Sequence, residues 1–181
     1  MNLSDRFLVS LPERSAHRLN NSLIYIERHD GDGASGWVVN KPIDEQFSKN
    51  LRHNMKLTVS DRPIYFGGPV TPGQAYVLHT TDVNINNTQR LTNNLAMTRD
   101  KQIINMLNLE NFPSQWRIVI GKCSWGPGQL ESEIYGSLTN GKSIWTSIPY
   151  NEELMWTPSV GQWRSGIEHS ASNMVNDLIN F

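Results

Sequence analysis

The residues of this sequence that could bind an anion lie in a glycine-rich segment that ends in Gly126-Pro127-Gly128. An apolar, β-branched run, Trp116 to Ile120, precedes this segment and predicts a strand. Gln129 to Ile134, which follows, predicts a short helix. Backbone amides at such a strand-to-helix bend can hold an anion. The alternative, which we favour, is a structural corner in which Trp125 fills the core.

Two histidines could supply a general base, His29 in a predicted turn and His79 at a predicted strand end. Together with an anion hole at the Gly126–Gly128 bend, either would make an enzyme that acts on a small anionic ligand. Cys123 is a weaker candidate nucleophile, because a lone cysteine at the end of a buried strand is more often inert packing.

Metal binding would need His29, Asp30 and His79 to converge with Asp32. The two histidines are far apart in sequence, and Asp-Gly turns are common for conformational reasons alone. Glu131 and Glu133 are two residues apart and cannot share a helix face as an acid–base pair. We therefore predict no metal, no cofactor and no catalytic residue.

Hydrophobic periodicity predicts many short strands with helices scattered between them. We predict strands over 6–11, 22–28, 34–40, 64–66, 75–79, 116–120 and 143–148, two more within 88–98, a loop at 13–21, and helices over 44–55, 100–108, 129–134 and 170–181. We expect 22–28 with 34–40, and 64–66 with 75–79, to form strand pairs, and helical pieces after 151 to break at Pro158 and Gly161. This order favours an α+β fold with a mixed or antiparallel sheet.

Composition places limits on the class of protein. The chain of 181 residues, 38% hydrophobic and 18% charged, fits a single domain over 1–181 with a real core. A net charge of −1 without clustered arginines disfavours direct nucleic-acid binding. We expect no signal peptide and no membrane span, and the single cysteine favours the cytoplasm.

The tryptophans divide into two groups. We expect Trp37, Trp116, Trp125 and Trp145 to lie in the core, because they lie in or beside apolar strands. Trp156 and Trp163 lie in the polar C-terminal region, where they could cap the core or form the contact surface of an interaction module.

Several motifs in a fixed order resemble one protein family. They are Phe7 to Pro12, Arg28-His29-Asp30, Gly33 to Pro42, Tyr65 to Val70, Ala75 to His79 and Gly121 to Glu133. Together, over residues 5 to about 168, they are similar to the AlgH/YqgE-like family of bacterial proteins of uncharacterised function. The chain departs from the family at Arg28-His29-Asp30, where the family usually has Glu-His-Asn. It also departs at Cys123, because the family usually has a small residue at this position.

The resemblance implies an α+β fold whose mixed, mostly antiparallel sheet curls into a pseudo-barrel with flanking helices. It also implies a bacterial or bacterial-virus origin and a cytoplasmic location. Family members are often labelled transcriptional regulators, but no helix-turn-helix pattern or basic helix accompanies that label here. The family supplies no catalytic residues.

We therefore favour a non-enzymatic regulatory or binding protein over an enzyme, with a protein or a small anionic ligand as partner. Sites on sheets tend to form at strand ends, which is where the polar and glycine positions of this sequence gather. The predicted ligand-binding surface consists of His29, Asp30, Asn40, Gly67, Gly68, His79, Trp125, Gly126, Gly128, Gln129 and Glu131.

Overall fold

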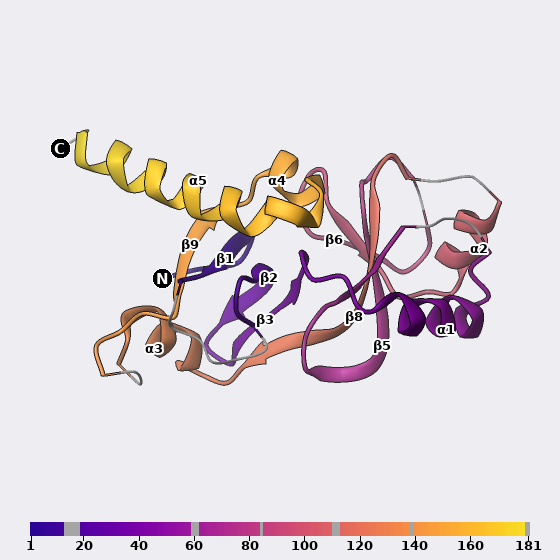
Figure 1. The fold of residues 1–181 in the computed structure, drawn as a ribbon, viewed down its shortest axis with the longest axis horizontal. Coiled ribbons are helices and arrows are strands. Elements are labelled where there is room, and N and C mark those ends of the chain that lie inside the picture. The colour runs from indigo at the N-terminus through magenta and orange to yellow at the C-terminus, as the bar shows by residue number, and fades with distance from the viewer. Residues whose placement is uncertain (13–18, 59–61, 84, 110–112, 138–139, 180–181) are drawn as a thin grey trace. The chain divides into compact units, whose positions relative to one another are not determined.

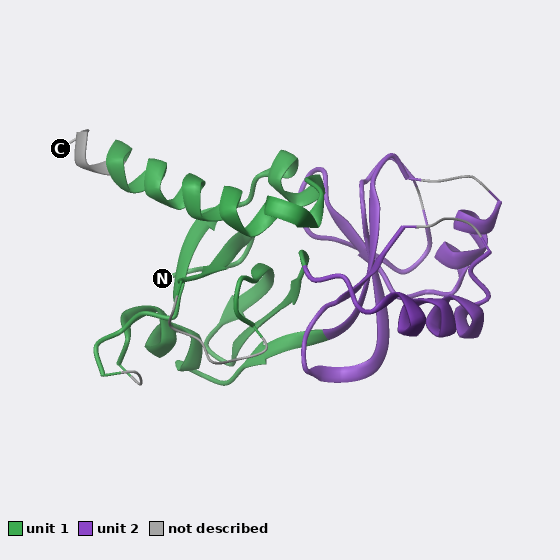
Figure 2. Cartoon of the chain, in the orientation of Figure 1, with its two compact units in different colours: residues 1–40, 122–181 green, residues 41–121 purple. Residues whose placement is uncertain are grey.

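The computed structural model describes residues 1–12, 19–58, 62–83, 85–109, 113–137 and 140–179 (Figure 1). Its contacts divide the chain into two compact units (Figure 2). Unit 1 consists of Met1–Asn40 and Lys122–Phe181, and unit 2 of Lys41–Gly121. The sequence predicts a single domain over 1–181, and this stays a prediction.

Unit 1 is built on an antiparallel sheet. Its strands are β1 (Arg6–Ser10), β2 (Leu23–Asp30), β3 (Gly33–Val38), the end of β8 (Trp116–Trp125) and β9 (Trp145–Pro149). The spatial order is β9-β1-β2-β3-β8, with Phe7 facing both Tyr25 and Ile148 in the register. Strands β1 and β3 are buried along almost their whole length, and β2 is buried over its apolar first part, from Leu23 to Ile26.

Three helices belong to unit 1: α3 (Gln129–Tyr135), α4 (Glu152–Trp156) and α5 (Ser159–Ile179). Helix α5 packs across β1, β2 and β9 (Figure 1). Gly166 allows this close packing, because a Cβ there would lie 3.2 Å from Leu23 and 3.3 Å from Val9. The backbone of α5 kinks at Val160 and Gly161, which confirms the predicted break near Pro158 and Gly161.

Unit 2 combines a mixed sheet with two helices. Its strands are β4 (Ile64–Phe66), β5 (Val70–His79), β6 (Thr88–Arg90), β7 (Ala96–Thr98) and the first part of β8, and its helices are α1 (Glu45–Met55) and α2 (Gln102–Asn108). Strand β4 runs parallel to β8, whereas β5, β7 and β6 pair antiparallel. Asp44 caps α1 by accepting hydrogen bonds from the amides of Gln46 and Phe47.

The core of unit 2 lies between its sheet and helices. The buried residues of this core are Leu57, Ile64, Val77, Ile85, Ile103, Leu107, Trp116 and Ile118. The first half of β5 is exposed, and only its last residues enter this core.

Three predictions about the strands are wrong. Strand β8 does not end at Ile120 but continues to Trp125, because Gly36, Ser35 and Ala34 of β3 pair with its last three residues. Strands β4 and β5 do not pair with each other, since β4 pairs with β8 and β5 with β7. The turn predicted at 29–33 is only two residues long, because β2 extends to Asp30 and β3 begins at Gly33.

The other predicted elements are close to those observed, and the α+β class with a mixed, mostly antiparallel sheet and flanking helices is confirmed. Residues 13–18 of the predicted loop and 180–181 of the predicted C-terminal helix lie outside the described residues. Trp37, Trp116, Trp125 and Trp145 are buried, as predicted. Within the described chain, no helix has the length and apolarity that crossing a membrane requires.

Candidate functional site

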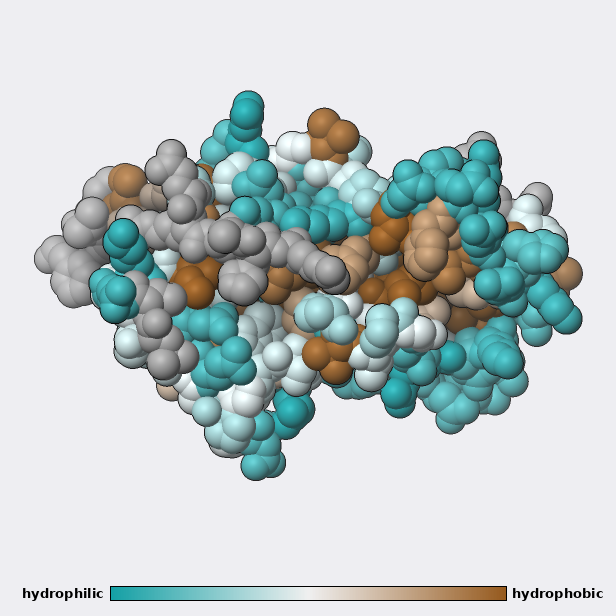
Figure 3. All heavy atoms as spheres, turned by 60° about the horizontal axis from the view of Figure 1, so that its bottom comes forward, coloured by the Kyte–Doolittle hydropathy of each residue, from teal (hydrophilic) through white to brown (hydrophobic). Residues whose placement is uncertain are grey.

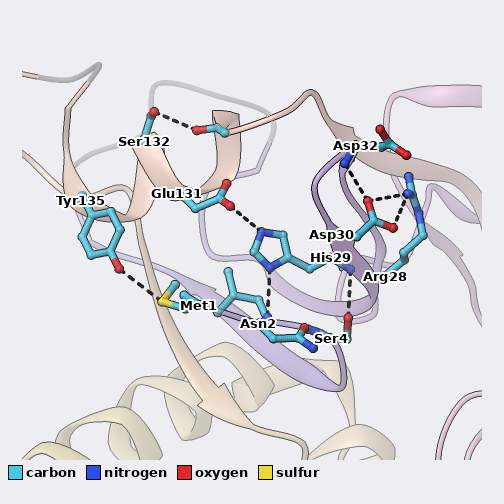
Figure 4. Close-up of polar contacts among 12 residues, drawn as sticks. Met1, Asn2, Ser4, Arg28, His29, Asp30, Asp32, Glu131, Ser132 and Tyr135 are labelled. Carbon is cyan, nitrogen blue, oxygen red and sulfur yellow. Dashed lines mark hydrogen bonds and ion pairs between the residues drawn. The ribbon is translucent and has the colours of Figure 1, made fainter.

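His29, one of the two candidate bases, lies in a closed set of hydrogen bonds (Figure 4). The amide of Leu3 donates to its Nδ1 at 3.0 Å, so Nε2 carries the ring proton and donates to Glu131 Oε1 at 2.9 Å. The ring is almost completely buried. The basic lone pair of His29 is therefore occupied by the chain itself, and the imidazole joins the N-terminal segment, β2 and α3.

Glu133, which the sequence did not place in the site, forms the centre of the polar contacts around α3. Its Oε2 accepts from the indole nitrogens of Trp125 at 2.9 Å and Trp145 at 2.7 Å, and its Oε1 accepts from Gln129 at 3.0 Å. The two indoles meet edge to face. We call His29, Trp125, Gln129, Glu131, Glu133 and Trp145 the α3 network.

Polar groups of the Gly126–Gly128 bend form hydrogen bonds with residues of helix α3. The amide of Gly126 donates to Gln129 Oε1 at 3.0 Å, and the carbonyl of Gly126 accepts from the amide of Gln129. The carbonyl of Gly128 accepts two bonds from Ser132. The bend thus uses its polar groups to begin the seven-residue helix α3, which agrees with the structural alternative.

Asp30 and Asn40 also make contacts within unit 1. Asp30 pairs with Arg28, which lowers the pKa of the carboxyl, and it accepts from the amide of Asp32 in the β2–β3 turn (Figure 4). Asn40 accepts from the amide of Leu23 and donates to the carbonyl of Asn21. Each side chain therefore stabilises the end of a strand.

Gly67, Gly68 and His79 belong to unit 2, whereas the other eight predicted site residues belong to unit 1. Gly67 and Gly121 pack backbone to backbone, so that a Cβ on Gly67 would lie 2.4 Å from the Gly121 carbonyl oxygen. Gly121 itself has φ of +77°, which other residues resist, and a Cβ there would lie 2.2 Å from the Gly68 oxygen. These glycines are required by the close approach of two chain segments.

His79, the last residue of β5, is fully buried, and both of its ring nitrogens are hydrogen-bonded. Its Nδ1–H donates to the carbonyl of Thr80 at 2.8 Å, and Nε2 accepts from the hydroxyl of Thr98 at 2.9 Å. Thr98 accepts in turn from Thr88 at 2.7 Å. Burial lowers the pKa of His79, which favours this neutral, fully bonded imidazole.

The remaining chemical candidates are no more reactive. Cys123 is buried, and burial raises the pKa of its thiol to about 12, so the thiolate is scarce at neutral pH. Across the described segments, no three His, Cys, Asp or Glu side chains converge as metal ligands. Trp163 donates to the carbonyl of Ser10, and both Trp163 and Trp156 are half-buried.

A pocket of about 460 Å³ lies within unit 2 and contains none of the predicted site residues. Its lining residues come from the end of α1, the exposed half of β5, and the segment that joins β7 to α2: Asn54, Met55, Lys56, Gly73, Gln74, Ala75, Val77, Thr98, Arg99, Asp100, Lys101, Ile103, Ile104 and Asn105. On the face drawn in Figure 3, unit 2 shows hydrophobic surface bordered by hydrophilic side chains.

Among the described residues that line this unit 2 pocket, positively charged side chains outnumber negatively charged ones. Lys56, Arg99 and Lys101 supply three cations, and their side chains bond no residue that the structure describes. Asp100 is the only carboxylate among the lining residues that the structure describes. It already accepts from the amide of Gln102 and the side chain of Asn87, bonds that lower its pKa.

A second hollow, of about 500 Å³, lies between β9 and α5 in unit 1. Its polar residues largely bond one another: Arg6 donates to Ser147, and Thr146 bonds Ser170. The unit 2 pocket is therefore the better candidate for a ligand site.

The profile of the AlgH-like family matches residues 7–174 of this sequence. The chain belongs to the AlgH-like family. Among AlgH-like relatives, a UPF0301 protein of Vibrio parahaemolyticus is 30% identical over 177 residues, which cover 93% of this chain and 91% of the relative. The UPF0301 protein YqgE of Escherichia coli is 30% identical over 173 residues, covering 91% and 89%.

Two solved structures share the fold of this chain. The solution structure of AlgH from Pseudomonas aeruginosa superposes with a TM-score of 0.75 at 22% identity, covering 94% of this chain and 89% of that one. A crystal structure of a protein from Corynebacterium diphtheriae gives 0.66 at 23% identity, covering 88% and 82%. These likenesses confirm the predicted α+β fold with a curled, mostly antiparallel sheet.

The pocket of this AlgH-like chain is not among the features predicted from its sequence. Lys56, Arg99 and Lys101 are ordinary exposed cations in the sequence, more than forty positions separate the first from the other two, and no motif joins them. The one available signal was local: Thr98-Arg99-Asp100-Lys101 places two cations and a helix-capping acid between a strand and a helix.

Proposed function

We propose that this protein is a non-enzymatic binding protein whose unit 2 pocket takes up a small organic anion. The observation that carries the proposal is the local charge. The side chains of Lys56, Arg99 and Lys101 bond no residue that the structure describes, whereas Asp100, the one carboxylate among the described lining residues, is already hydrogen-bonded. This local excess of positive charge occurs in a chain whose net charge is −1. A concave site with apolar walls and a few convergent polar groups is the usual form of a small-molecule site.

The geometry supports binding rather than catalysis. A general base needs a lone pair that faces its substrate. The basic lone pair of His29 accepts from Leu3, and that of His79 accepts from Thr98, whose hydroxyl is itself buried. The alternative of an enzyme at the Gly126–Gly128 bend has less support, because Gln129 occupies the amide of Gly126.

We further propose that the protein works in the cytoplasm, and that any regulatory role follows from occupancy of the pocket rather than from direct contact with DNA. The buried, lone Cys123 is suited to a reducing compartment. The net charge of −1 opposes binding to a polyanion, whereas a small anion meets only the local excess of cations.

The test is calorimetric titration of the full chain with pyrophosphate and citrate. We expect saturable binding that weakens at least tenfold in the double variant Arg99→Gln/Lys101→Gln. The matched control is Arg90→Gln/Lys49→Gln, which makes the same charge change at exposed positions outside the pocket lining. Equal weakening in both variants would show that the anion responds only to net charge and would overturn the proposed site.

A further inference from the structure

Carboxamide side chains also line the unit 2 pocket. Asn54 and Asn105 line it, and their side chains bond nothing in the described parts of the chain. Gln74 donates from Nε2 to the carbonyl of Ala75, which leaves its Oε1 as an acceptor. A carboxamide presents a donor and an acceptor side by side, a pair that matches the edge of a nucleobase.

The pocket also has aliphatic walls. Val77 and Ile103 are buried core residues that reach its surface, and Ile104 and Met55 are half-buried beside them. A volume of about 460 Å³ far exceeds what an inorganic anion fills and is typical of sites for drug-sized ligands. An anion without an organic body would leave this apolar surface exposed to water.

We infer that the ligand is a nucleoside phosphate. Its phosphate groups bind Lys56, Arg99 and Lys101, its base packs on the aliphatic walls, and the edge of the base meets Asn54 and Asn105. This inference rests on the proposed function, because it assigns a ligand class to the same pocket. The inference makes two demands of the ligand that a simple anion does not meet. The ligand must have a planar group that packs on the aliphatic walls, and the edge of this group must form hydrogen bonds with the two asparagine side chains.

The test compares adenosine and guanosine 5′-phosphates with ligands that lack one part. Ribose 5-phosphate has the phosphate without the base, adenosine has the base without the phosphate, and pyrophosphate has neither base nor sugar. By calorimetry on the full chain, we expect at least one nucleotide to bind tenfold or more tightly than ribose 5-phosphate. We expect adenosine alone to bind more weakly than its phosphates.

Two double variants then locate the contacts. Asn54→Ala/Asn105→Ala is expected to weaken nucleotide binding about tenfold and leave pyrophosphate binding unchanged, whereas Arg99→Gln/Lys101→Gln is expected to weaken both. Asn50→Ala/Asn86→Ala, at exposed positions outside the lining, is the matched control and is expected to change neither. Thermal unfolding of each variant establishes that it is folded before titration.

The results of these titrations distinguish failure of the nucleoside phosphate inference from failure of the proposed anion site. If pyrophosphate or citrate binds through Arg99 and Lys101 but no nucleotide exceeds ribose 5-phosphate, the nucleoside inference is overturned and the anion site stands. If nucleotides bind equally well to the Asn54→Ala/Asn105→Ala variant, the assigned base contacts are wrong. If no anion binds at all, both proposals fail.

Discussion

Glu133 in unit 1 accepts three hydrogen bonds from its own chain, whereas Lys56, Arg99 and Lys101 in unit 2 bond no described residue. Both groups contain charged side chains that lie in or beside helices. In the α3 network these side chains bind one another and hold α3 to the sheet. In the pocket they border a hollow with apolar walls.

This difference shows that the type of a residue is a poor guide to its use. His29 and Glu131 are the kinds of residue that catalysis requires, yet both ring nitrogens of His29 and one carboxylate oxygen of Glu131 already bond within the chain. Lysine and arginine at exposed positions are ordinary, yet three of them line one pocket of unit 2 and bond no residue that the structure describes. Substitutions should therefore change stability in the α3 network and affinity in the pocket.

The largest effect is expected at Glu133. Glu133→Ala removes the acceptor for two indole donors on buried rings, and we expect a loss of about 3 kcal/mol in the free energy of unfolding. Urea denaturation measures this loss, and anion binding to unit 2 should not change.

Glu133→Gln is the matched control for this prediction. The amide keeps one acceptor oxygen, so its loss should be about 1 kcal/mol. If Glu133→Ala loses no more than its control does, then water has replaced the carboxylate and the α3 network does not stabilise the fold.

The next effect is expected at Glu131. Glu131→Ala leaves the buried Nε2–H of His29 without its acceptor, and we expect a loss of about 1.5 kcal/mol in the free energy of unfolding. Glu131→Gln retains an acceptor and should lose less. A change in anion affinity for either variant would contradict the expectation that the α3 network affects only stability.

A third effect concerns pH and His79. Because burial lowers the pKa of folded His79, the unfolded chain takes up a proton below about pH 6.5 that the folded chain excludes. Stability should therefore fall as the pH drops through this value, by at most about 1.4 kcal/mol per pH unit from this residue.

The comparison that isolates His79 is urea denaturation of the wild type and of His79→Gln between pH 7.5 and 5. Glutamine keeps a donor and an acceptor but has no proton to gain, so the difference in stability between the two proteins should shrink on acidification. A difference that stays constant with pH would show that His79 does not resist protonation.

The smallest effect is expected from salt. Raising NaCl from about 0.1 M to about 1 M shortens the screening length from roughly 10 Å to roughly 3 Å, so exposed cations attract an anion less strongly. We expect the affinity for pyrophosphate to fall several-fold by calorimetry. An affinity that does not depend on salt would mean that Lys56, Arg99 and Lys101 do not act on the ligand.

Much of the fold follows from local patterns. The hairpin of β2 and β3, the short strands β6 and β7, and the helices α1 and α2 have apolar periodicity, turn residues and capping acids within a few positions of one another. The structural role of the Gly126–Gly128 bend was also the favoured interpretation, because its residue types suit a corner whether or not an anion is present.

The rest depends on contacts between distant residues. The extension of β8 to Trp125 depends on pairing with Ala34, about ninety positions earlier in the sequence. The residue types of the 121–125 segment do not by themselves predict this pairing. The partners of His29 and His79, and the convergence of Lys56 with Arg99 and Lys101, are likewise products of the completed fold. Local sequence supplies the residue types but not their neighbours.

The division of the chain also affects the order in which it can fold. Unit 2 is one continuous stretch, Lys41–Gly121, whereas unit 1 needs both ends of the chain, since β1 pairs with β9 across more than 130 residues. A ribosome therefore releases all of unit 2 while β1, β2 and β3 still lack the strands and helices that cover them. We expect unit 2 to form first, and the nascent N-terminal strands to depend on chaperones until the C-terminal segment emerges.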